Sequence, residues 1–431
     1  MRCLFVTQYY PPETGAAPNR LWDWTQRLAA WGHQVTVITA VPNYPRGAIF
    51  AGYRDSYLYD ERAGSLRVLR TRIYVSRNPG FVQRLICYFS FVLASILVGV
   101  TKVGPQDVIL VESPPLFLGL SGLVLKTLLR AKLVFNVSDL WPESAVAMGV
   151  LHNPWLIRIS TRLEELFYRH SELVTGQTEH IVAHISGRVR VPTALITNGV
   201  DADVFSDRAL VKREAHREAL GFSKHFVVGY AGLLGMAQGL DVVLDTADLL
   251  RAFPDVLFVL IGDGPEKTRL CAEAERRGLA NVRFFPPQPN RDMPAVMASF
   301  DAAVVPLKRL ELFKGALPCK LFESMAAGTA VIVAIAGEAQ RLVEDADGGI
   351  CVPPEDATSM GDAILRLRAD SALRARLATH GRAYVLRHFN RHNIAARLHD
   401  LLLTLAGTGK RAELAGISED SHRRRSASPV R

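Results

Sequence analysis

Cysteines are few in this sequence, and their placement excludes a disulfide framework and a zinc site. The 431 residues include five cysteines, an odd number, and no two of them form a C-x-x-C pair. Disulfide scaffolds need paired cysteines, and zinc sites need Cys or His ligands at short spacing, so neither is expected here. We therefore predict no metal and no other cofactor, and a reducing, cytoplasmic compartment.

Targeting signals and long apolar runs are also missing. The strand-like run Arg2–Thr7 begins directly after Met1, which predicts no secretory signal. The charge-free run Leu85–Val100 has 16 residues, fewer than the about 20 that a membrane-spanning helix needs. It predicts either a buried helix or a helix lying in a membrane interface. A second, mostly apolar helix is expected at Leu116–Leu129.

Positive charge exceeds negative charge, most of all in the first half. The net charge is +9, and residues 1–200 hold 20 Lys and Arg against 13 Asp and Glu. No acid occurs between Arg62 and Arg84. Such a region predicts contact with an anionic membrane surface or a phosphorylated lipid, although a solvated basic face would look the same. Nucleic acid is not expected, because no aromatic stacking platform accompanies the arginines. The arginines assigned to membrane or acceptor contact are Arg67, Arg70, Arg72, Arg77 and Arg84.

Short apolar runs alternate with amphipathic stretches through both halves of the chain. Buried strands are expected at residues 2–7, 34–39, 107–111, 132–137, 226–230, 256–261, 282–285, 302–305 and 331–334. Helices are expected at residues 19–31, 156–168, 239–251, 266–277, 293–298 and 320–326. Strands separated by helices pair in parallel through right-handed crossovers. The pattern predicts an α/β fold made of two Rossmann-like domains in tandem.

The predicted domains face each other across a cleft lined by the carboxyl ends of their strands, the usual ligand position in open α/β sheets. The first domain is expected at residues 1–205 and the second at residues 206–382, because a polar stretch interrupts the strand pattern near the boundary. Residues 383–407 predict a helix that crosses back to the first domain. Residues 408–431 lack apolar surface and are expected to be disordered.

Three loops have little side-chain bulk where a strand meets a helix. Gly15 follows the first strand with two alanines after it, and residues 229–239 hold four glycines, among them Gly232 and Gly235. The third loop, Gly262–Pro265, follows the strand at 256–261. Exposed backbone N–H groups in such loops bind phosphate groups, so we predict a nucleotide cradle. The G-x-x-x-x-G-K-S/T and G-x-G-x-x-G spacings are absent. Around Gly15 an ordinary surface turn explains the sequence equally well.

The segment Lys320–Gly328 predicts a short helix that carries one acid, Glu323, and ends at a glycine before a buried strand. Taken together, these motifs resemble those of the family 4 retaining glycosyltransferases, which have the GT-B fold. The chain is similar to the bacterial branch of O-antigen and exopolysaccharide transferases that includes L-fucosamine transferases. The segments that carry the resemblance are Gln8–Pro18, Asn43–Pro45, Phe135–Glu143, Gly229–Leu240, Gly262–Pro265 and Leu317–Gly328.

The resemblance implies a donor site in the second domain. It assigns Gly15 to the donor diphosphate, and it assigns Glu323 to the two ribose hydroxyls of the nucleotide. A solvated helix acid is the alternative for Glu323. The full set of expected donor-binding residues is Gly15, Gly232, Gly235, Gln238, Gly262, Lys320, Leu321 and Glu323.

Three positions depart from the family pattern. Many members have a basic pair in the glycine loop, where this chain has Leu233 and Gln238. Many have a glutamate eight residues before the ribose glutamate, where this chain has Gly315. Many have a histidine after the fourth strand, where this chain has Ser138. The usual set of charges is therefore incomplete.

Lys320, Glu323 and Asp139 are the expected catalytic residues. Lys320 would stabilise the negative charge of the departing nucleoside diphosphate, unless it is an ordinary surface lysine. Lys308, Arg309 and Lys314 are weaker candidates for that task. Asp139 would orient or deprotonate the acceptor hydroxyl, unless it caps the helix that begins near Pro142. Glu112 is the second choice for this carboxylate, and the departing phosphate can itself take the proton.

The resemblance implies a retaining transfer of a sugar from a nucleotide diphosphate, with UDP and an N-acetylated deoxy sugar as the expected donor components. The acceptor would be a lipid-pyrophosphate-linked saccharide on the inner face of the cell membrane, where the enzyme would be peripheral. Two alternatives stay open: a UDP-N-acetylglucosamine 2-epimerase, and a catalytically inactive scaffold of a polysaccharide-synthesis complex. Membrane binding distinguishes the first alternative, and donor turnover distinguishes the second.

Overall fold

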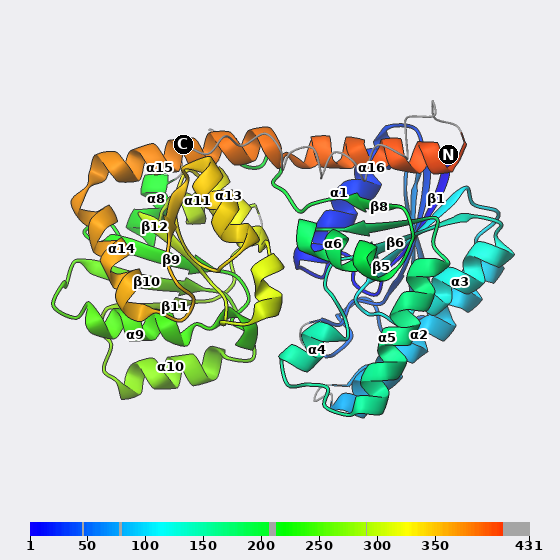
Figure 1. Ribbon diagram of the computed structural model, residues 1–431, viewed down its shortest axis with the longest axis horizontal. Helices are drawn as coiled ribbons and strands as arrows, with labels where there is room; N and C mark the ends of the chain where they lie inside the picture. Colours follow the sequence, from blue (N-terminus) through cyan, green and yellow to red (C-terminus); the bar gives the residue numbers. More distant parts are fainter. Residues whose placement is uncertain (45–46, 77–79, 207–212, 290, 408–431) are drawn as a thin grey trace. The chain divides into compact units, whose positions relative to one another are not determined.

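The computed structural model describes residues 1–44, 47–76, 80–206, 213–289 and 291–407 (Figure 1). The chain forms two compact units. The N-terminal unit comprises residues 1–197 and the chain from residue 392 onward, and the C-terminal unit comprises residues 198–391. The predicted boundary at residues 205 and 206 lies eight residues further along the chain than this division. Residues 408–431, expected to be disordered, lie outside the described residues.

The N-terminal unit contains an eight-stranded sheet in the order β3-β4-β2-β1-β5-β6-β7-β8. All neighbouring strands are parallel except β3 and β4, which are antiparallel. The central strands are buried along almost their whole length, as continuous apolar runs require in a sheet covered on both faces. The strands are β1 (Arg2–Val6), β2 (Gln34–Ala40), β3 (Leu58–Ala63), β4 (Leu66–Thr71), β5 (Val108–Ser113), β6 (Lys132–Val137), β7 (Leu173–Gly176) and β8 (Thr193–Leu195).

Helices cover this sheet, and α5 begins with a regular capping arrangement. Asn153 caps α5 by accepting from the Trp155 and Leu156 amides, and Pro154 occupies its first turn. The predicted helices at 19–31 and 156–168 are confirmed, each with an earlier start. The helices are α1 (Ala16–Ala30), α2 (Phe81–Lys102), α3 (Leu118–Leu128), α4 (Glu143–Ala147), α5 (Pro154–Arg169) and α6 (Glu179–Arg188).

The C-terminal unit repeats the arrangement with six parallel strands in the order β11-β10-β9-β12-β13-β14. Its strands are β9 (Phe226–Ala231), β10 (Val256–Ile261), β11 (Val282–Phe285), β12 (Ala302–Pro306), β13 (Ala330–Ala334) and β14 (Gly349–Cys351). The helical segments include α8 (Arg213–Ala219), η1 (Met236–Gln238), α9 (Asp241–Leu249), α10 (Lys267–Arg276), α11 (Met293–Ala298), η2 (Glu311–Gly315), α12 (Cys319–Ala326), α13 (Glu338–Ala346) and α14 (Ala357–Ala369). The expected strands of this half are confirmed to within one residue.

The helix expected at 383–407 is two helices, α15 (Ser371–His388) and α16 (Arg391–Leu405). The break falls at Phe389 and Asn390, where the Phe389 carbonyl and Asn390 pair with the backbone of Val200. The α16 residues Ala395, Leu398 and Leu402 are buried in the core of the N-terminal unit. The last helix therefore returns to the first unit, as the sequence predicts.

In each sheet, strand order reverses beside one central strand. β1 lies between β2 and β5, and β9 lies between β10 and β12. Ligands in open α/β sheets bind outside the carboxyl ends of the strands at such a reversal. The loops that leave β1 and β9 are the two that hold Gly15 and the glycine-rich segment 232–239, so the fold places both predicted loops at these positions.

Candidate functional site

The glycine loop after β9 packs backbone to backbone against the loop after β10. The Gly232 amide donates to the Ile261 carbonyl at 2.9 Å, and the Leu234 amide donates to the Asp263 carbonyl at 2.9 Å. Gly262 has φ +153°, and a Cβ atom there would lie 1.9 Å from the Gly232 carbonyl oxygen. No other residue fits, so Gly262 supports the loop by its lack of a side chain.

Beside this loop lies a pocket of about 240 Å³. It contains Lys308, one of the weaker candidate cations, and the Lys308 amide donates to the Ala237 carbonyl at 3.0 Å. Of the other two weaker candidates, the Arg309 guanidinium donates to the Pro354 carbonyl, and Lys314 forms an ion pair with Glu311. The pocket is lined by Gly235, Met236, Gly239, Leu240, Asp241, Glu266, Arg269, Leu270 and Lys308.

Lys320 reaches from the first turn of α12 into the glycine loop. Its Nζ donates to the Tyr230 Oη at 2.5 Å and to the Gln238 Oε1 at 2.6 Å. The Nζ also lies 4.1 Å from the centre of the Tyr230 ring. A Cβ atom on Gly232 would lie 3.5 Å from the Nζ, so the ammonium group sits directly against the loop. Burial lowers the pKa of Lys320 to about 7.

Glu323 lies one turn further along the same helix and is half-buried. Its carboxylate accepts no hydrogen bond within the described part of the chain, so both oxygens are available to a ligand. Burial raises the pKa of this carboxyl group, and the positive charges of Arg391 and Lys320 oppose the rise. A half-buried carboxylate without a donor is suited to accept the hydroxyls of a sugar.

Two other predicted donor residues have different surroundings. Gln238 lies in η1 and holds Lys320, as described above. Leu321 is fully buried in the core of the C-terminal unit, and its amide donates to the Pro318 carbonyl. The side chain of Leu321 therefore packs the site from behind and cannot contact a donor directly, which corrects its assignment as a donor contact.

Gly15 lies at the start of α1, as the sequence predicts. It is exposed, has φ +154° and provides no side-chain cap to the helix. The 15-residue helix behind it directs its N-terminal amides toward this point, so the position can receive an anion.

A buried polar cluster at the carboxyl ends of β5, β6 and β7 was not expected from the sequence. Arg20 forms an ion pair with Glu112 at 2.7 Å, with both side chains almost inaccessible. Ser138 accepts hydrogen bonds from Arg20 at 2.7 Å and from Gln177 at 2.6 Å, and it donates to Glu112. Asn136 donates to the second Glu112 oxygen at 2.6 Å. Glu112 and Ser138 are therefore held by protein partners, which weakens Glu112 as a proton acceptor.

Asp139 is exposed immediately after this cluster. Although the residue as a whole is exposed, the chain packed around its carboxyl group raises the pKa of that group by desolvation, and hydrogen bonds from the Ser144 side chain and the Leu140 amide oppose the rise. Ser144 lies in the first turn of α4, so these contacts favour the structural role at the helix start. The catalytic role of Asp139 stays a prediction.

The described arginines among those assigned to membrane contact differ in exposure. Arg70 is 4% exposed and binds Glu61 and the Pro11 carbonyl, so it is a structural residue and its assignment is wrong. Arg67 pairs with Asp60 through two hydrogen bonds. Arg72 and Arg84 are exposed. Arg77 lies outside the described residues.

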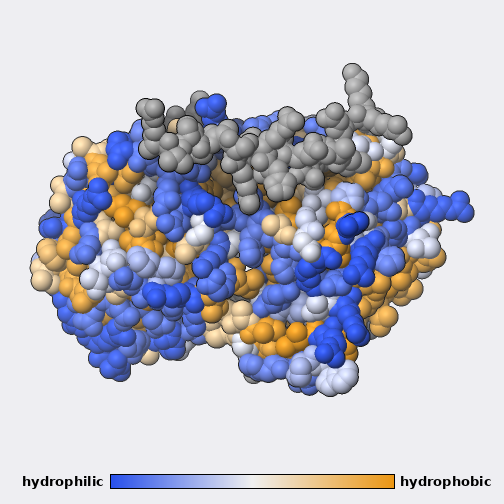
Figure 2. Space-filling model, viewed as in Figure 1, coloured by the Kyte–Doolittle hydropathy of each residue, from blue (hydrophilic) through white to orange (hydrophobic). Residues whose placement is uncertain are grey.

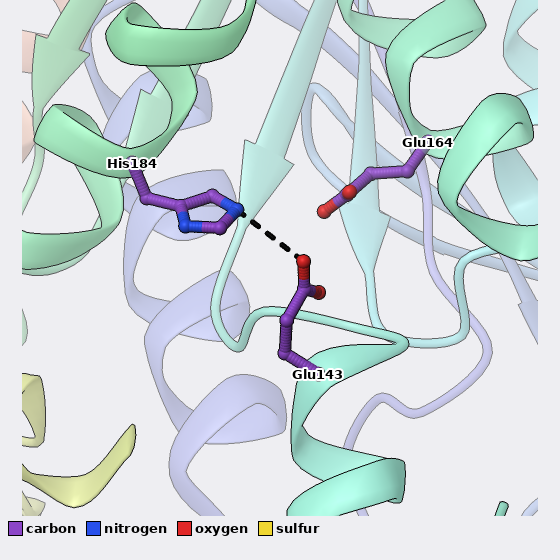
Figure 3. Close-up of side chains that lie close together, drawn as sticks. All are labelled: Glu143, Glu164 and His184. Atoms are coloured by element: carbon purple, nitrogen blue, oxygen red, sulfur yellow. Dashed lines mark ion pairs between the residues drawn. The ribbon is translucent and has the colours of Figure 1, made fainter. Parts of the chain in front are cut away.

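One cluster in the N-terminal unit has the composition of a metal site. Ligand atoms of Glu143, Glu164 and His184 lie within 4.8 Å of one another (Figure 3). The Arg188 guanidinium, however, already donates to Glu164 at 2.6 Å and to Glu143 at 3.2 Å. The positive charge of Arg188 occupies the place that a cation would take, so these residues do not favour a metal.

Two family models match the chain, and together they cover most of both units. The model described as "Glycosyl transferase 4-like domain" matches residues 15–199, and "Glycosyl transferases group 1" matches residues 212–384. The two sheets and the returning helix are the GT-B fold of nucleotide-sugar glycosyltransferases. The chain belongs to the group 1, family 4-like glycosyltransferases, a retaining family.

Individual proteins agree with this family. WcaI of Escherichia coli (strain K12), named as a glycosyl transferase of colanic acid biosynthesis, is 29% identical over 84% of this chain and 90% of its own length. The sucrose-phosphate synthase of Thermosynechococcus elongatus has a TM-score of 0.75 at 19% identity, covering 95% of this chain and 100% of its own. Anabaena Alr3699/HepE, solved in complex with UDP-glucose, has a TM-score of 0.71 at 20% identity, covering 94% and 100%. At these identities the two solved structures support the fold alone.

Proposed function

We propose that this glycosyltransferase moves a sugar from a UDP-linked donor to a lipid-pyrophosphate-linked saccharide during the synthesis of a surface polysaccharide. The observation that carries the proposal is that one helix beside the glycine loop presents both Lys320 and Glu323, a carboxylate with no hydrogen-bond donor in the described part of the chain. The name of WcaI supports an exopolysaccharide product, and the UDP-glucose complex of HepE supports UDP as the nucleotide.

Each part of the donor has a matching group in this site. Glu323 accepts hydrogen bonds from the ribose hydroxyls, and the amides of the glycine loop face the diphosphate together with Lys320. During transfer the bond between the sugar C1 and the phosphate oxygen breaks, and a bond from C1 to the acceptor oxygen forms. The proton of the acceptor hydroxyl goes to the departing phosphate. Lys320 stabilises the negative charge that develops there.

The proposal includes attachment to the cytoplasmic face of the membrane through α2. Six apolar residues at helical spacing form one exposed line on this helix, here called the α2 stripe, and each is 40–69% exposed. The stripe extends for about 27 Å. It consists of Val82, Ile86, Phe89, Leu93, Leu97 and Val100.

The opposite side of α2 packs on the protein. Phe91, Ser95 and Val98 are buried, and the Ser95 hydroxyl lies 2.8 Å from that of Ser121 on α3. By length and composition alone, Val82–Lys102 could cross a membrane, with 28% of its apolar window buried. A helix with one packed side and one exposed apolar side is suited to lie in a membrane interface, the second of the two sequence interpretations.

Neighbouring helices extend the apolar surface. On α5, Trp155 is 69% exposed and Ile159 is 51% exposed, and on α3 Leu128 is 57% exposed. Figure 2 shows apolar colour along the edge of the N-terminal unit where Figure 1 labels α2, α3 and α5. Arg84 is exposed on α2, and Arg158 lies against the Trp155 ring. Tryptophan and arginine beside an apolar face are typical of contact with anionic lipid.

Calorimetry with UDP, GDP and ADP tests the donor site. We expect selective binding of UDP, and at least about a tenfold loss of affinity in Glu323→Gln, because a hydrogen bond to a charged group contributes about 1.5–3 kcal/mol. Glu344→Gln, which changes an exposed glutamate on α13, is the matched control.

Failure of all three nucleotides to bind would contradict the donor assignment. Binding without any turnover, with lipid vesicles and a lipid-linked acceptor present, would favour the inactive scaffold instead.

A further inference from the structure

Among the residues that the structure describes, the Lys320 ammonium has polar partners but no anionic one. Its two hydrogen-bond acceptors, the Tyr230 hydroxyl and the Gln238 side-chain carbonyl, are both neutral. Within the described ranges, no carboxylate lies at ion-pair distance from its Nζ. A cation withdrawn from water is normally paired with a negative charge, because desolvation of an unpaired charge is costly. The site is therefore built for an anion that comes from outside the chain.

The acceptors are themselves held in place. The Tyr230 hydroxyl donates to the Leu233 carbonyl at 2.6 Å, which directs an oxygen lone pair toward Lys320. Gln238 lies in η1, and the glycine loop connects it to Tyr230 at the end of β9. Lys320 is therefore bound to both ends of the loop that faces the diphosphate.

Few titratable groups influence Lys320. On its own helix these are Glu323, one turn away, and Cys319, and both favour the charged amine. From β9 the facing group is the Tyr230 phenol, whose pKa burial raises well above its ordinary value, so it remains neutral. From η1 the facing group is the uncharged Gln238 amide. The distribution of charge leaves the protonation of Lys320 sensitive to an arriving anion.

We propose that the donor diphosphate binds against Lys320 and that this binding is coupled to uptake of a proton by the Lys320 amine, with Tyr230 and Gln238 as positioning residues. The inference rests on the proposed function, because it needs a nucleotide diphosphate at this loop. In this arrangement Tyr230, Gln238 and Lys320 together replace the basic pair that many family members have in the loop.

The direction of the coupling follows from electrostatics. Burial lowers the pKa of Lys320 to about 7, so near pH 8 most molecules of the free protein hold a neutral amine. A diphosphate against the Nζ favours the ammonium form and raises this pKa. The Lys320 amine then takes up a proton on binding at pH 8 and almost none at pH 6, where it is already charged.

Calorimetry of UDP binding at pH 8 in HEPES and in Tris tests the coupling, because these buffers differ in ionisation enthalpy. For the wild-type protein we expect close to one proton taken up per UDP. Lys320→Arg stays charged at any pH, so it should bind UDP with no uptake. Lys320→Met should lose about tenfold or more in affinity and should also show no uptake.

Tyr230→Phe separates positioning from packing. The ring remains in the core, but the hydroxyl that accepts from the Lys320 Nζ is lost and the ammonium form is disfavoured. We therefore expect UDP affinity to fall more at pH 8 than at pH 6, while thermal unfolding is unchanged. UDP binding by the wild type without proton uptake, or uptake that persists in Lys320→Met, would overturn this inference and leave the donor site intact. Absence of UDP binding would overturn the proposed function, and this inference with it.

Discussion

Two residues of the candidate donor site, Gly262 and Glu323, each have a role that depends on a missing group. Gly262 lets the backbones of two loops meet, and Glu323 lacks a donor within the described chain. The sequence shows both features, as a glycine-rich turn and as a lone acid on a short helix. It does not show Tyr230 beside Lys320 or Arg20 beside Glu112, because these contacts join residues that are 90 and 92 positions apart. The burial of Arg70 was not predicted either, because it depends on Glu61 of the neighbouring strand and on the Pro11 carbonyl, 59 positions away.

Gly262→Ala should weaken the donor site by disturbing the contact between its two loops. The added Cβ would overlap the Gly232 carbonyl, and the backbone has φ +153°, so we expect the free energy of unfolding to fall by about 1–3 kcal/mol. UDP affinity should fall as well, because the two loops must separate. Chemical denaturation and calorimetry measure both effects.

Gly187→Ala is the control for this substitution. It lies on α6 with open space around it and should be neutral or slightly stabilising. A Gly262→Ala protein that equals wild type in stability and UDP affinity would show that the loop contact is unimportant.

Among the elements, α2 differs most from the sequence prediction, both in its length and in having one packed side and one exposed side. The charge-free run of 16 residues lies within a helix of 22, because helix-compatible residues flank it on both sides. Strand positions follow the apolar runs closely, since burial on both sheet faces requires such runs. The sequence cannot tell which side of α2 is packed, because apolar residues occur all round the helix. That distinction comes from contacts such as Ser95 with Ser121.

The double substitution Leu93→Gln and Leu97→Gln should weaken binding to vesicles of anionic phospholipid. These side chains are 69% and 65% exposed, so their loss removes apolar contact with lipid while the core keeps its packing. We expect about tenfold weaker co-sedimentation and unchanged thermal unfolding.

Leu249→Gln, at a residue 57% exposed on α9 of the other unit, is the matched control and should bind vesicles as wild type does. Equal vesicle binding by all three proteins would argue against the α2 stripe as the lipid contact.

At the scale of the whole molecule, the N-terminal unit combines distant parts of the chain. His33, after α1, lies with its Nε2 2.6 Å from that of His399 on α16. Burial lowers the pKa of both rings, and the N-terminal ammonium of Met1 adds to the effect. The His399 ring further lowers the pKa of His33, whereas Asp400 opposes the shift at His399. The domain order and the returning helix were predictable from the sequence. This contact was not, because scattered histidines have no pattern of their own.

The stability of the N-terminal unit should fall as the pH drops. The folded state favours neutral rings, whereas histidine in an unfolded chain takes up protons near pH 6.5. Stabilisation is therefore complete above this value and is lost progressively below it, toward the lowered pKa of the folded state. All five tryptophans lie in this unit, so their fluorescence during denaturant unfolding at pH 8 and pH 5.5 follows it selectively.

His399→Gln should reduce this pH dependence, and His152→Gln, at an exposed histidine, should preserve it. An unchanged dependence in His399→Gln would show that other groups control the acid response.

The burial of α16 in the first core also has a consequence for how the protein is made. Residues 392–405 leave the ribosome only after nearly 200 residues of the C-terminal unit have been translated. At about 5–20 residues per second this delay is about 10–40 s. During that time the apolar core of the N-terminal unit lacks Ala395, Leu398 and Leu402, which complete it. The N-terminal unit therefore cannot complete its core until almost the whole chain has been made, and residues 1–197 expressed alone should be less stable than the same unit in the full chain.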